Sequence, residues 1–220
     1  MMISYVKEHY EKHLAKYYSW MSGGLAKKIE ENRRFFKDQH VQPRGSGVAV
    51  DLGAGSGFQS IPLAELGFSV IAIDLSKNLL AELKKNAKGV PIEIVNDDLL
   101  NFPKHCPARI ELVVCMGDTL THLNTHQDIR HLLTMIYNAL ETGGRVILTF
   151  RDLTTELRGL DRFIPIRNDA NTIFTCFLDY EKDYVKVHDI IYERKKTIGI
   201  LKKVFLKKFA FFRNGQEKFY

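Results

Sequence analysis

The chain has 220 residues, of which 45% are hydrophobic and 26% are charged, and its formal net charge is +6. This length and balance allow one α/β domain with appendages to bury a full core, and they exclude a disordered or fibrous protein. The three cysteines, Cys106, Cys115 and Cys176, show neither paired nor metal-like spacing. We therefore expect reduced thiols, no metal site and a cytoplasmic protein. Charged residues soon after Met1 and the lack of long apolar runs predict neither a signal peptide nor a transmembrane segment.

Two helices are predicted near the start of the chain, over 4–16 and 25–36, because apolar residues recur there at helical spacing. Between them lies the aromatic stretch Tyr17-Tyr-Ser-Trp-Met-Ser-Gly-Gly24, which ends in two glycines. Such a stretch is typical of a connecting loop. We interpret residues 1–45 as an N-terminal helical lid.

The segment Val48-Ala-Val-Asp-Leu-Gly-Ala-Gly-Ser-Gly57 is an apolar run that closes in an acid and three glycines. It predicts a strand and a turn too tight for side chains, before a helix over 57–66, so that backbone N–H groups face a ligand. The dinucleotide pattern G-x-G-x-x-G has a different spacing, which disfavours an NAD oxidoreductase. Asp51 lies two residues before the first glycine and suits a cation, such as the α-amino group of S-adenosylmethionine.

Two further strands end in acids. The strand over 69–74 ends at Asp74, at the distance from the glycine turn where a carboxylate binds ribose hydroxyls. The strand over 92–95 is followed by Asp97 and Asp98, where a carboxylate can accept a hydrogen bond from an adenine amine. Three acids at three consecutive strand ends predict one cleft.

The alternation of strands and helices then continues. Four more elements are predicted: a helix over 77–87, a strand over 110–116, a helix over 125–141 and a strand over 145–150. Gly143 and Gly144 are expected to end the second of these helices. We therefore expect residues 46–155 to form a Rossmann-like, doubly wound and mainly parallel α/β sheet that binds the cofactor.

After residue 155 the pattern changes. Residues 172–180 alternate between apolar and polar, and a second such run over 185–192 follows a short polar turn, which predicts an antiparallel hairpin or meander. The final residues mix lysines and arginines with apolar side chains. We interpret 156–220 as an antiparallel β segment and a basic tail packed on the core. The tail is either a solvated face of a strand or helix, or a surface for RNA or an anionic membrane.

Together these motifs resemble class I S-adenosylmethionine-dependent methyltransferases, and within that class glycine N-methyltransferase and its small-molecule relatives. The likeness covers about residues 14–192. Its most specific part is the run Gly117-Asp-Thr-Leu-Thr-His-Leu123. The resemblance implies S-adenosylmethionine as cofactor, S-adenosylhomocysteine as product, and a small-molecule acceptor that is an amine or an amino acid.

The resemblance also implies roles for single residues. The cofactor would be held by Tyr18, Asp51, Gly53, Ala54, Gly55, Gly57, Asp74, Leu75, Asp97, Asp98, Leu99, Met116 and Gly117. Arg151 matches the arginine that binds the carboxylate of glycine, and a guanidinium fork suits a planar carboxylate. His122 and Asp118 are the candidates if a general base is used.

Three departures from the family pattern concern the acceptor and the sheet edge. Asp118 replaces an asparagine and favours a cationic or amine substrate. The segment 163–167 replaces one with tyrosines that help to hold glycine. After Thr197 a short basic tail replaces two further sheet strands, so either the hairpin completes the sheet edge or something else covers it.

Two alternative functions stay open. The basic tail fits an RNA methyltransferase, but the chain lacks the proline-rich loop after the fourth strand that clamps a flipped base, so we do not expect nucleic acid as acceptor. The missing strands fit a non-catalytic subunit that only binds S-adenosylmethionine. A homo-oligomer is compatible with each of these functions.

Overall fold

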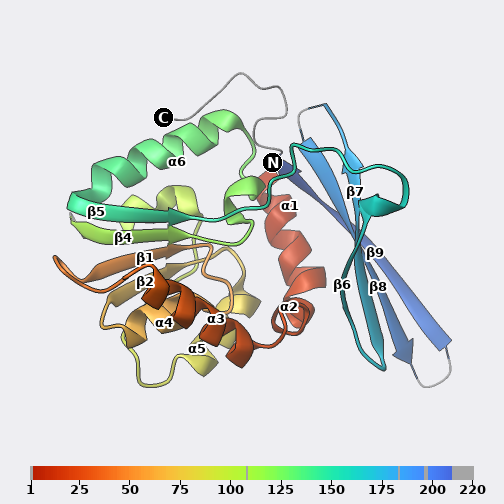
Figure 1. The fold of residues 1–220 in the computed structure, drawn as a ribbon, viewed down its shortest axis with the longest axis horizontal. Coiled ribbons are helices and arrows are strands. Elements are labelled where there is room, and N and C mark those ends of the chain that lie inside the picture. Colours follow the sequence, from red (N-terminus) through yellow and green to blue (C-terminus); the bar gives the residue numbers. More distant parts are fainter. Residues whose placement is uncertain (1, 108, 183, 196–197, 210–220) are drawn as a thin grey trace.

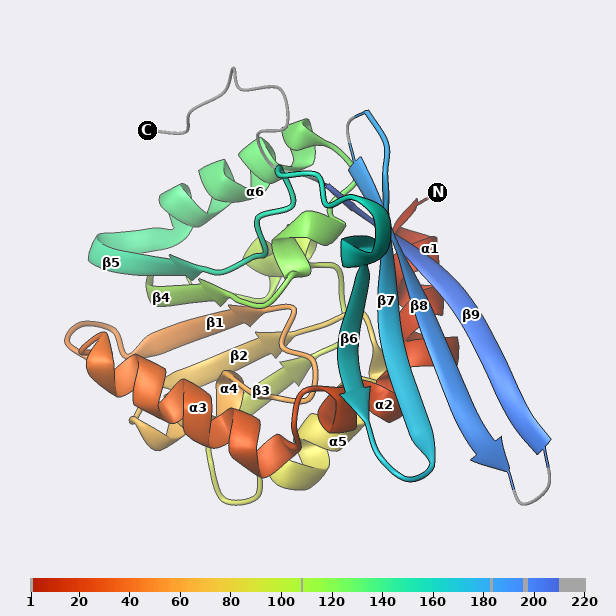
Figure 2. The ribbon, with the colours of Figure 1, turned by 45° about the vertical axis from the view of Figure 1, so that its right-hand side comes forward.

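The computed structural model describes residues 2–107, 109–182, 184–195 and 198–209, which form two sheets with the N-terminal helices between them (Figures 1 and 2). The first sheet is parallel and consists of β1 (Val48–Leu52), β2 (Ser69–Ile73), β3 (Ile92–Val95), β4 (Ile110–Cys115) and β5 (Leu140–Leu148). Its strand order, β3-β2-β1-β4-β5, reverses direction beside β1. The predicted Rossmann-like fold class is confirmed.

Helices cover both faces of the parallel sheet because successive residues of its buried strands point to opposite sides. These helices are α3 (Leu25–Asp38), α4 (Ser60–Glu65), α5 (Lys77–Asn86), α6 (His126–Ala139) and the 3-10 helix η2 (Leu99–Lys104). On one face, Phe36 of α3 and Leu63 of α4 belong to one buried cluster. On the other face, Ile129 and Leu132 of α6 belong to a second. This layering leaves the carboxyl ends of the strands open for a site.

The N-terminal segment is one nearly continuous helix that reaches Met21, so the prediction that this helix ends at Lys16 is wrong, and the break before the next helix is limited to residues 22–24. It consists of α1 (Met2–His9), the π-helical turn η1 (Tyr10–Leu14) and α2 (Ala15–Met21). At the π turn the N–H of Ala15 donates to the carbonyl of Tyr10, five residues earlier. The aromatic side chains that looked like a loop pack the lid against both sheets, and this packing outweighs their weak helix propensity.

The transition from α6 to β5 also differs from the prediction. The helix ends at Ala139 and β5 begins at once, so Gly143 and Gly144 lie inside the strand and do not end the helix. Gly143 has φ of 82°, and the pairing of β5 with β4 shifts register before Arg145. The glycines therefore serve an irregular stretch of strand.

The second sheet is antiparallel, with order β6-β7-β8-β9. It follows the short 3-10 helix η4 (Gly159–Arg162) and consists of β6 (Phe163–Asn168), β7 (Thr172–Tyr180), β8 (Tyr184–Lys195) and β9 (Ile198–Phe209). The predicted hairpin corresponds to β7 and β8. Within the segment expected to be a basic tail, 198–209 pair with β8 along its length. The rest of that tail, 210–220, lies outside the described residues.

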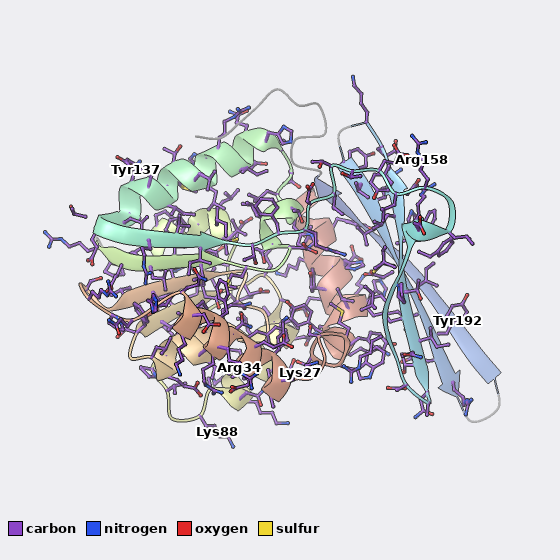
Figure 3. The ribbon with its side chains drawn as sticks, in the orientation of Figure 1. Lys27, Arg34, Lys88, Tyr137, Arg158 and Tyr192 are labelled. Atoms are coloured by element: carbon purple, nitrogen blue, oxygen red, sulfur yellow. The ribbon has the colours of Figure 1, made fainter. Side chains whose placement is uncertain are left out.

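The hairpin does not complete the parallel sheet. In the described part of the chain, β5 pairs with β4 on one side and with no strand on the other. The inner face of the antiparallel sheet instead packs on the lid, where Phe174 and Val187 join Leu14 in one buried cluster. Tyr137 and Tyr192, by contrast, are well exposed and point outward from α6 and β8 (Figure 3). The lid is thus held between the two sheets.

Candidate active site

The turn after β1 has a backbone that favours glycine. Gly53, Gly55 and Gly57 have φ of 78°, 52° and 86°, in the region that side chains disfavour. A Cβ on Gly53 would lie 2.3 Å from Cγ2 of Thr119, and one on Gly57 would lie 2.2 Å from Cδ1 of Leu83. The loop after β4 and helix α5 therefore pack directly on the turn. Both conformation and space require glycine at these positions.

A cavity opens beside this turn at the carboxyl ends of the parallel strands, and we call it the sheet-end cavity. It lies where α/β folds of this kind bind ligands, outside the carboxyl ends of the strands next to the point where the strand order reverses. The structure brings together there these predicted residues: Tyr18, Gly53, Gly55, Asp74, Leu75, Asp97, Asp98, Leu99 and His122. The lid adds Val6, Lys7 and Tyr10, which the sequence did not single out.

Asp74 ties the turn to the end of β2. Its two carboxylate oxygens accept the N–H groups of Gly55, at 2.9 Å, and Ser76, at 2.7 Å. Burial raises the pKa of Asp74, and these two hydrogen bonds oppose the rise. A carboxylate has about four lone-pair sites. Asp74 can therefore accept further hydrogen bonds from hydroxyl groups in the cavity.

Asp97 and Asp98 also line the sheet-end cavity. Asp97 lies 2.7 Å from Nε2 of His105 and accepts a second hydrogen bond from Asn101. His105 is the main reason that the pKa of Asp97 is lowered to about 2. Asp98 caps η2 by accepting the N–H of Leu100 at 2.9 Å. These contacts fix both carboxylates in place, and the loop between β3 and η2 with them.

Asp51 does not lie where the sequence suggested. It is 1% exposed and lines no cavity described here, and its carboxylate accepts the hydroxyl of Ser60 at 2.5 Å. Burial raises its pKa to about 7, against the opposing effect of the Ser60 hydrogen bond. Asp51 therefore links β1 to the start of α4 within the core and stabilises the glycine turn between them. Of the other predicted residues, Ala54 and Gly57 likewise line neither the sheet-end cavity nor the one described next.

Two tyrosines of the lid cover the glycine turn. The Tyr18 ring stacks on Phe58 at a centroid distance of 5.3 Å, and its Cε1 would lie 3.2 Å from a Cβ on Gly55. The Tyr10 hydroxyl lies 3.2 Å from Nε2 of His122. Burial raises the pKa of both phenols, so both are neutral at ordinary pH. Both rings are fixed, Tyr18 by stacking and Tyr10 by its hydrogen bond.

A second cavity lies between the lid, the parallel sheet and the antiparallel sheet, and we call it the inter-sheet cavity. The predicted residues Met116, Gly117, Asp118 and Arg151 line its parallel-sheet side. The lid and the antiparallel sheet supply mainly apolar side chains, among them Leu14, Met21, Ile166, Phe174 and Val187. Tyr10, Tyr18 and Gly53 line both cavities, so the two meet at these residues.

Asp118 and Arg151 form a tight ion pair in the wall of the inter-sheet cavity. Nη2 and Nε of Arg151 lie 2.6 and 2.7 Å from Oδ2 of Asp118, and the Arg151 N–H donates to Oδ1. Burial lowers the pKa of Arg151, but the Asp118 carboxylate outweighs it and the net shift is upward. The two charges largely cancel. The sequence suggested that Asp118 gives the cavity a negative charge, but its pairing with Arg151 largely cancels that charge. Arg151 can bind a second carboxylate only with the N–H groups that Asp118 leaves unoccupied.

Asp189 of β8 is a site residue that the sequence analysis missed. It lines the inter-sheet cavity and is 5% exposed, with Oδ2 at 2.9 Å from Nε2 of His9 and Oδ1 at 3.1 Å from Sγ of Cys176. A signal was present in the sequence. Val187, Asp189 and Ile191 alternate along one face of the strand, and an acid in such an apolar row needs a reason.

Tyr10 was also missed, although its position follows a pattern. Tyr10, Leu14, Tyr18 and Met21 recur at nearly helical spacing and all line the inter-sheet cavity. This stripe could have been recognised if the aromatic stretch had been read as a continuation of the helix.

Other chemistries find less support. No group of three or more His, Cys, Asp or Glu side chains gathers to hold a metal within the residues described. Cys115 is fully buried, and burial raises its thiol pKa to about 12, so it is a core residue. Over the same residues, no helix is both long and apolar enough to cross a membrane.

Comparisons with known proteins agree with this geometry. A family model described as a methyltransferase domain matches residues 49–144. The glycine/sarcosine N-methyltransferase of Halorhodospira halochloris is 28% identical over 193 residues, which cover 74% of this chain and 72% of that protein. The enzyme of the same name from Aphanothece halophytica is 32% identical over 129 residues, or 58% of this chain and 48% of that protein. The match therefore spans about half the length of the second relative.

Solved structures share the fold at lower identity. An S-adenosylmethionine-dependent methyltransferase of Clostridium acetobutylicum aligns with a TM-score of 0.64 and 16% identity, over 95% of this chain and 80% of its own. A sugar N-methyltransferase of a Streptoalloteichus species aligns with a TM-score of 0.65 and 14% identity, over 85% and 74%. The likeness covers both sheets, not the parallel sheet alone.

Proposed function

We propose that this chain, which belongs to the class I S-adenosylmethionine-dependent methyltransferases, methylates a nitrogen atom of a small amine or amino acid. The observation that carries the proposal is the junction of the two cavities at Tyr10, Tyr18 and Gly53. With this junction, a cofactor in the sheet-end cavity would lie beside an acceptor in the inter-sheet cavity, and a direct transfer requires such neighbouring sites. The names of the relatives, which act on glycine and sarcosine or on sugar nitrogens, support nitrogen as the target.

The sheet-end cavity fits the cofactor in its chemistry. The glycine turn offers a backbone surface without side chains, and Asp74 has acceptor sites left for ribose hydroxyls. Asp98 and Leu99 line the wall where a carboxylate and a backbone amide can read an adenine ring. When bound, S-adenosylmethionine supplies an activated methyl group. Asp51 acts beneath the turn and holds its shape.

The chain's own contribution to the reaction is mainly to position the acceptor. Holding two reactants in line can supply about 7–11 kcal/mol of the barrier reduction. The amine attacks with its lone pair, so it must first lose a proton, and it can lose that proton to water. A dedicated base is therefore not required. His122 lines the sheet-end cavity and holds Tyr10, and we propose that it positions this tyrosine.

Asp118 and Arg151 are proposed to bind the acceptor as a unit. An amino acid would place its carboxylate against the Arg151 guanidinium, which keeps N–H groups beyond those that Asp118 occupies. Asp118 would then hold the guanidinium in the plane that this contact needs. This arrangement differs from an isolated arginine, because each partner restricts the other.

The three parts of the chain are proposed to divide the work. Residues 1–45 form the lid, 46–155 bind the cofactor, and the antiparallel sheet within 156–220 supplies the second wall of the acceptor site. The three free cysteines fit a reducing compartment, which supports the cytoplasm as the location.

The test is transfer of the methyl group from labelled S-adenosylmethionine to a panel of small amines and amino acids. The matching control panel holds the same molecules with a hydroxyl in place of the amine, together with bulk RNA. Label on amines alone, with release of S-adenosylhomocysteine, is the expected result. Label on RNA, or tight cofactor binding without transfer to any acceptor, would contradict the proposal.

A further inference from the structure

We infer that Asp189 is the anchor for the amino group of the acceptor, and that the acceptor is an amine with an apolar body. The inference rests on the proposed function, because it concerns the cavity in which that acceptor would bind. The inference goes beyond the proposed function because it names the residue that selects the amine and the chemical class of acceptor that the cavity binds.

The first argument is the position of the charge. Asp189 is the one charged side chain among the buried residues described on β7 and β8, and Phe174, Val187 and Ile191 surround it on the same face. Burying a carboxylate among apolar side chains costs several kcal/mol unless it is paired. The buried His9 pairs with Oδ2 at 2.9 Å, whereas the described donor to Oδ1 is the weak thiol of Cys176. An apolar residue would fill the place without this cost, so a carboxylate kept in the wall of the cavity points to a role there.

The second argument is the acceptor capacity of the carboxylate. His9 and Cys176 each contact one oxygen, at 2.9 and 3.1 Å, and the carboxylate lines the cavity. With about four lone-pair sites, Asp189 can accept further hydrogen bonds from that side. It can accept an N–H of an ammonium group and still accept one after the amine has lost a proton. The lone pair of the nitrogen then stays available.

The third argument is the balance of charge in the inter-sheet cavity. Asp118 and Arg151 pair with each other, and Lys28 at the cavity pairs with Glu31 at 2.9 Å. Asp189 pairs with His9, which is a cation only when protonated, so the described contacts of this carboxylate include no permanent cation. A cation entering the cavity is therefore attracted to the β8 side.

The fourth argument is the lining around this charge. Leu14, Met21, Ile166 and Phe174 present apolar surface on the lid and on the antiparallel sheet. Glycine has no side chain to cover this surface, whereas an aliphatic or aromatic body would remove it from water at about 25 cal/mol per Å². The geometry favours an amine whose other end is apolar.

Binding to the protein loaded with S-adenosylhomocysteine tests the inference without turnover. The probe is phenethylamine, a cation at neutral pH, and its match is 2-phenylethanol, which has a hydroxyl in place of the amine. Calorimetry should show the amine binding about 10-fold more tightly to the wild type, as expected of a hydrogen bond to a charged group. D189N should remove this preference and leave binding of S-adenosylhomocysteine unchanged.

The control variant is D179N. Asp179 lies on β7 and pairs with Arg162, with its side chain 41% exposed, so this change removes an acid from the same sheet without touching the cavity. D179N should keep the preference for the amine. H9Q should keep it too, because glutamine can still donate to Asp189.

Two results would overturn the inference: equal affinity of the wild type for amine and alcohol, or an amine preference that survives in D189N. If D189N does not fold, D189S serves for the second comparison, and the first needs no variant. The proposed function fails separately. If the wild type prefers the amine but transfers no methyl group to any amine, the proposed function is refuted and the Asp189 site stands. If methyl transfer occurs and D189N has the same acceptor KM as the wild type, only this inference is refuted.

Discussion

The two cavities meet at the same residues but are built from different kinds of structure. The sheet-end cavity is made mostly from a backbone turn and from carboxylates such as Asp74 and Asp98, which follow consecutive strands. The inter-sheet cavity is made from side chains of the lid, of the loop after β4 and of the antiparallel sheet. Short motifs at the strand ends supply most of the first, whereas the second also needs the lid and the antiparallel sheet. A cofactor site of this kind can be recognised largely from local motifs, and the acceptor site only on its parallel-sheet side.

The largest predicted effect is the pH dependence of stability caused by Asp51, which is buried next to the glycine turn of the sheet-end cavity. The pKa of Asp51 is about 7 in the folded protein and about 4 in the unfolded chain, so the folded state holds the proton more tightly. Stability from this group is fully present below pH 4 and is lost as the pH rises to about 7. The loss is ~4 kcal/mol at most. D51N should remove this part of the pH dependence of the unfolding free energy, measured by urea denaturation between pH 4 and 8.

The measurement needs a matched variant, and D128N in the first turn of α6, where the side chain is partly exposed, provides one. It should keep the wild-type pH profile. A wild-type stability that stays flat from pH 4 to 7 would show that Asp51 is not held as a buried acid.

The second prediction separates the two cavities. D74A removes the acceptor of the Gly55 and Ser76 N–H groups and the proposed ribose ligand. Hydrogen bonds to a charged group contribute about 1.5–3 kcal/mol, so the dissociation constant for S-adenosylhomocysteine should rise about 10- to 150-fold. Calorimetry measures it. D189N, from the inter-sheet cavity, is the control and should bind S-adenosylhomocysteine as tightly as the wild type does. An unchanged dissociation constant in D74A would show that Asp74 is not part of the cofactor site.

The third prediction concerns the ion pair in the inter-sheet cavity. R151K replaces a planar fork by a single ammonium, so it should raise the KM of a carboxylate-bearing acceptor about 10-fold and leave cofactor affinity unchanged. D118N should raise the same KM by a smaller factor, because the guanidinium loses the carboxylate that holds it in plane. Steady-state kinetics with an amino acid and with its decarboxylated amine measures both. If the two acceptors respond alike, the acceptor does not bind through Arg151.

The smallest predicted effect concerns Tyr10, which lines both cavities, so a change there should affect both cofactor and acceptor. Y10F removes one neutral hydrogen bond, to His122, from a ring that lines both cavities. A bond of this kind contributes about 0.5–1.5 kcal/mol, so kcat/KM should fall about 2- to 10-fold. Y137F, on the exposed face of α6, should behave as the wild type. An effect on cofactor affinity alone would assign Tyr10 to the sheet-end cavity and not to the junction.

The success of sequence reasoning followed this same division. The parallel sheet and the turn at Gly53 were predictable because apolar runs, glycines and acids recur at fixed local spacing. Asp51 was predicted to face the ligand, but its carboxylate is buried against Ser60. The spacing of residues in the motif gives the position of Asp51 on the strand, but not the side of the turn that its carboxylate faces. Asp118 was misread for a different reason: its partner, Arg151, lies at the end of another strand.

The second sheet was harder to predict than the first. The strand β9 is rich in lysine, and its pairing with β8 is a tertiary contact that composition does not reveal. The lid was misread at Tyr17 because an aromatic run that ends in glycines is typical of a loop. Asp189 carried a local signal, a break in apolar alternation, but its importance depends on His9, 180 positions away.

The π turn in the lid sets the rotation of one half of the helix against the other. Each residue of an α-helix advances the side chains by about 100°, and a π turn accommodates one extra residue. His9 lies before the turn and contacts the antiparallel sheet, whereas Tyr18 lies after it and covers the glycine turn. A deletion of one residue outside Tyr10–Leu14 would turn the side chains beyond it by about that angle, whereas a deletion within the π turn would restore an α-helical turn and keep the two halves in nearly the same rotation. The place of the π turn along the helix, and not only the composition of the helix, therefore determines which side chains enter the site.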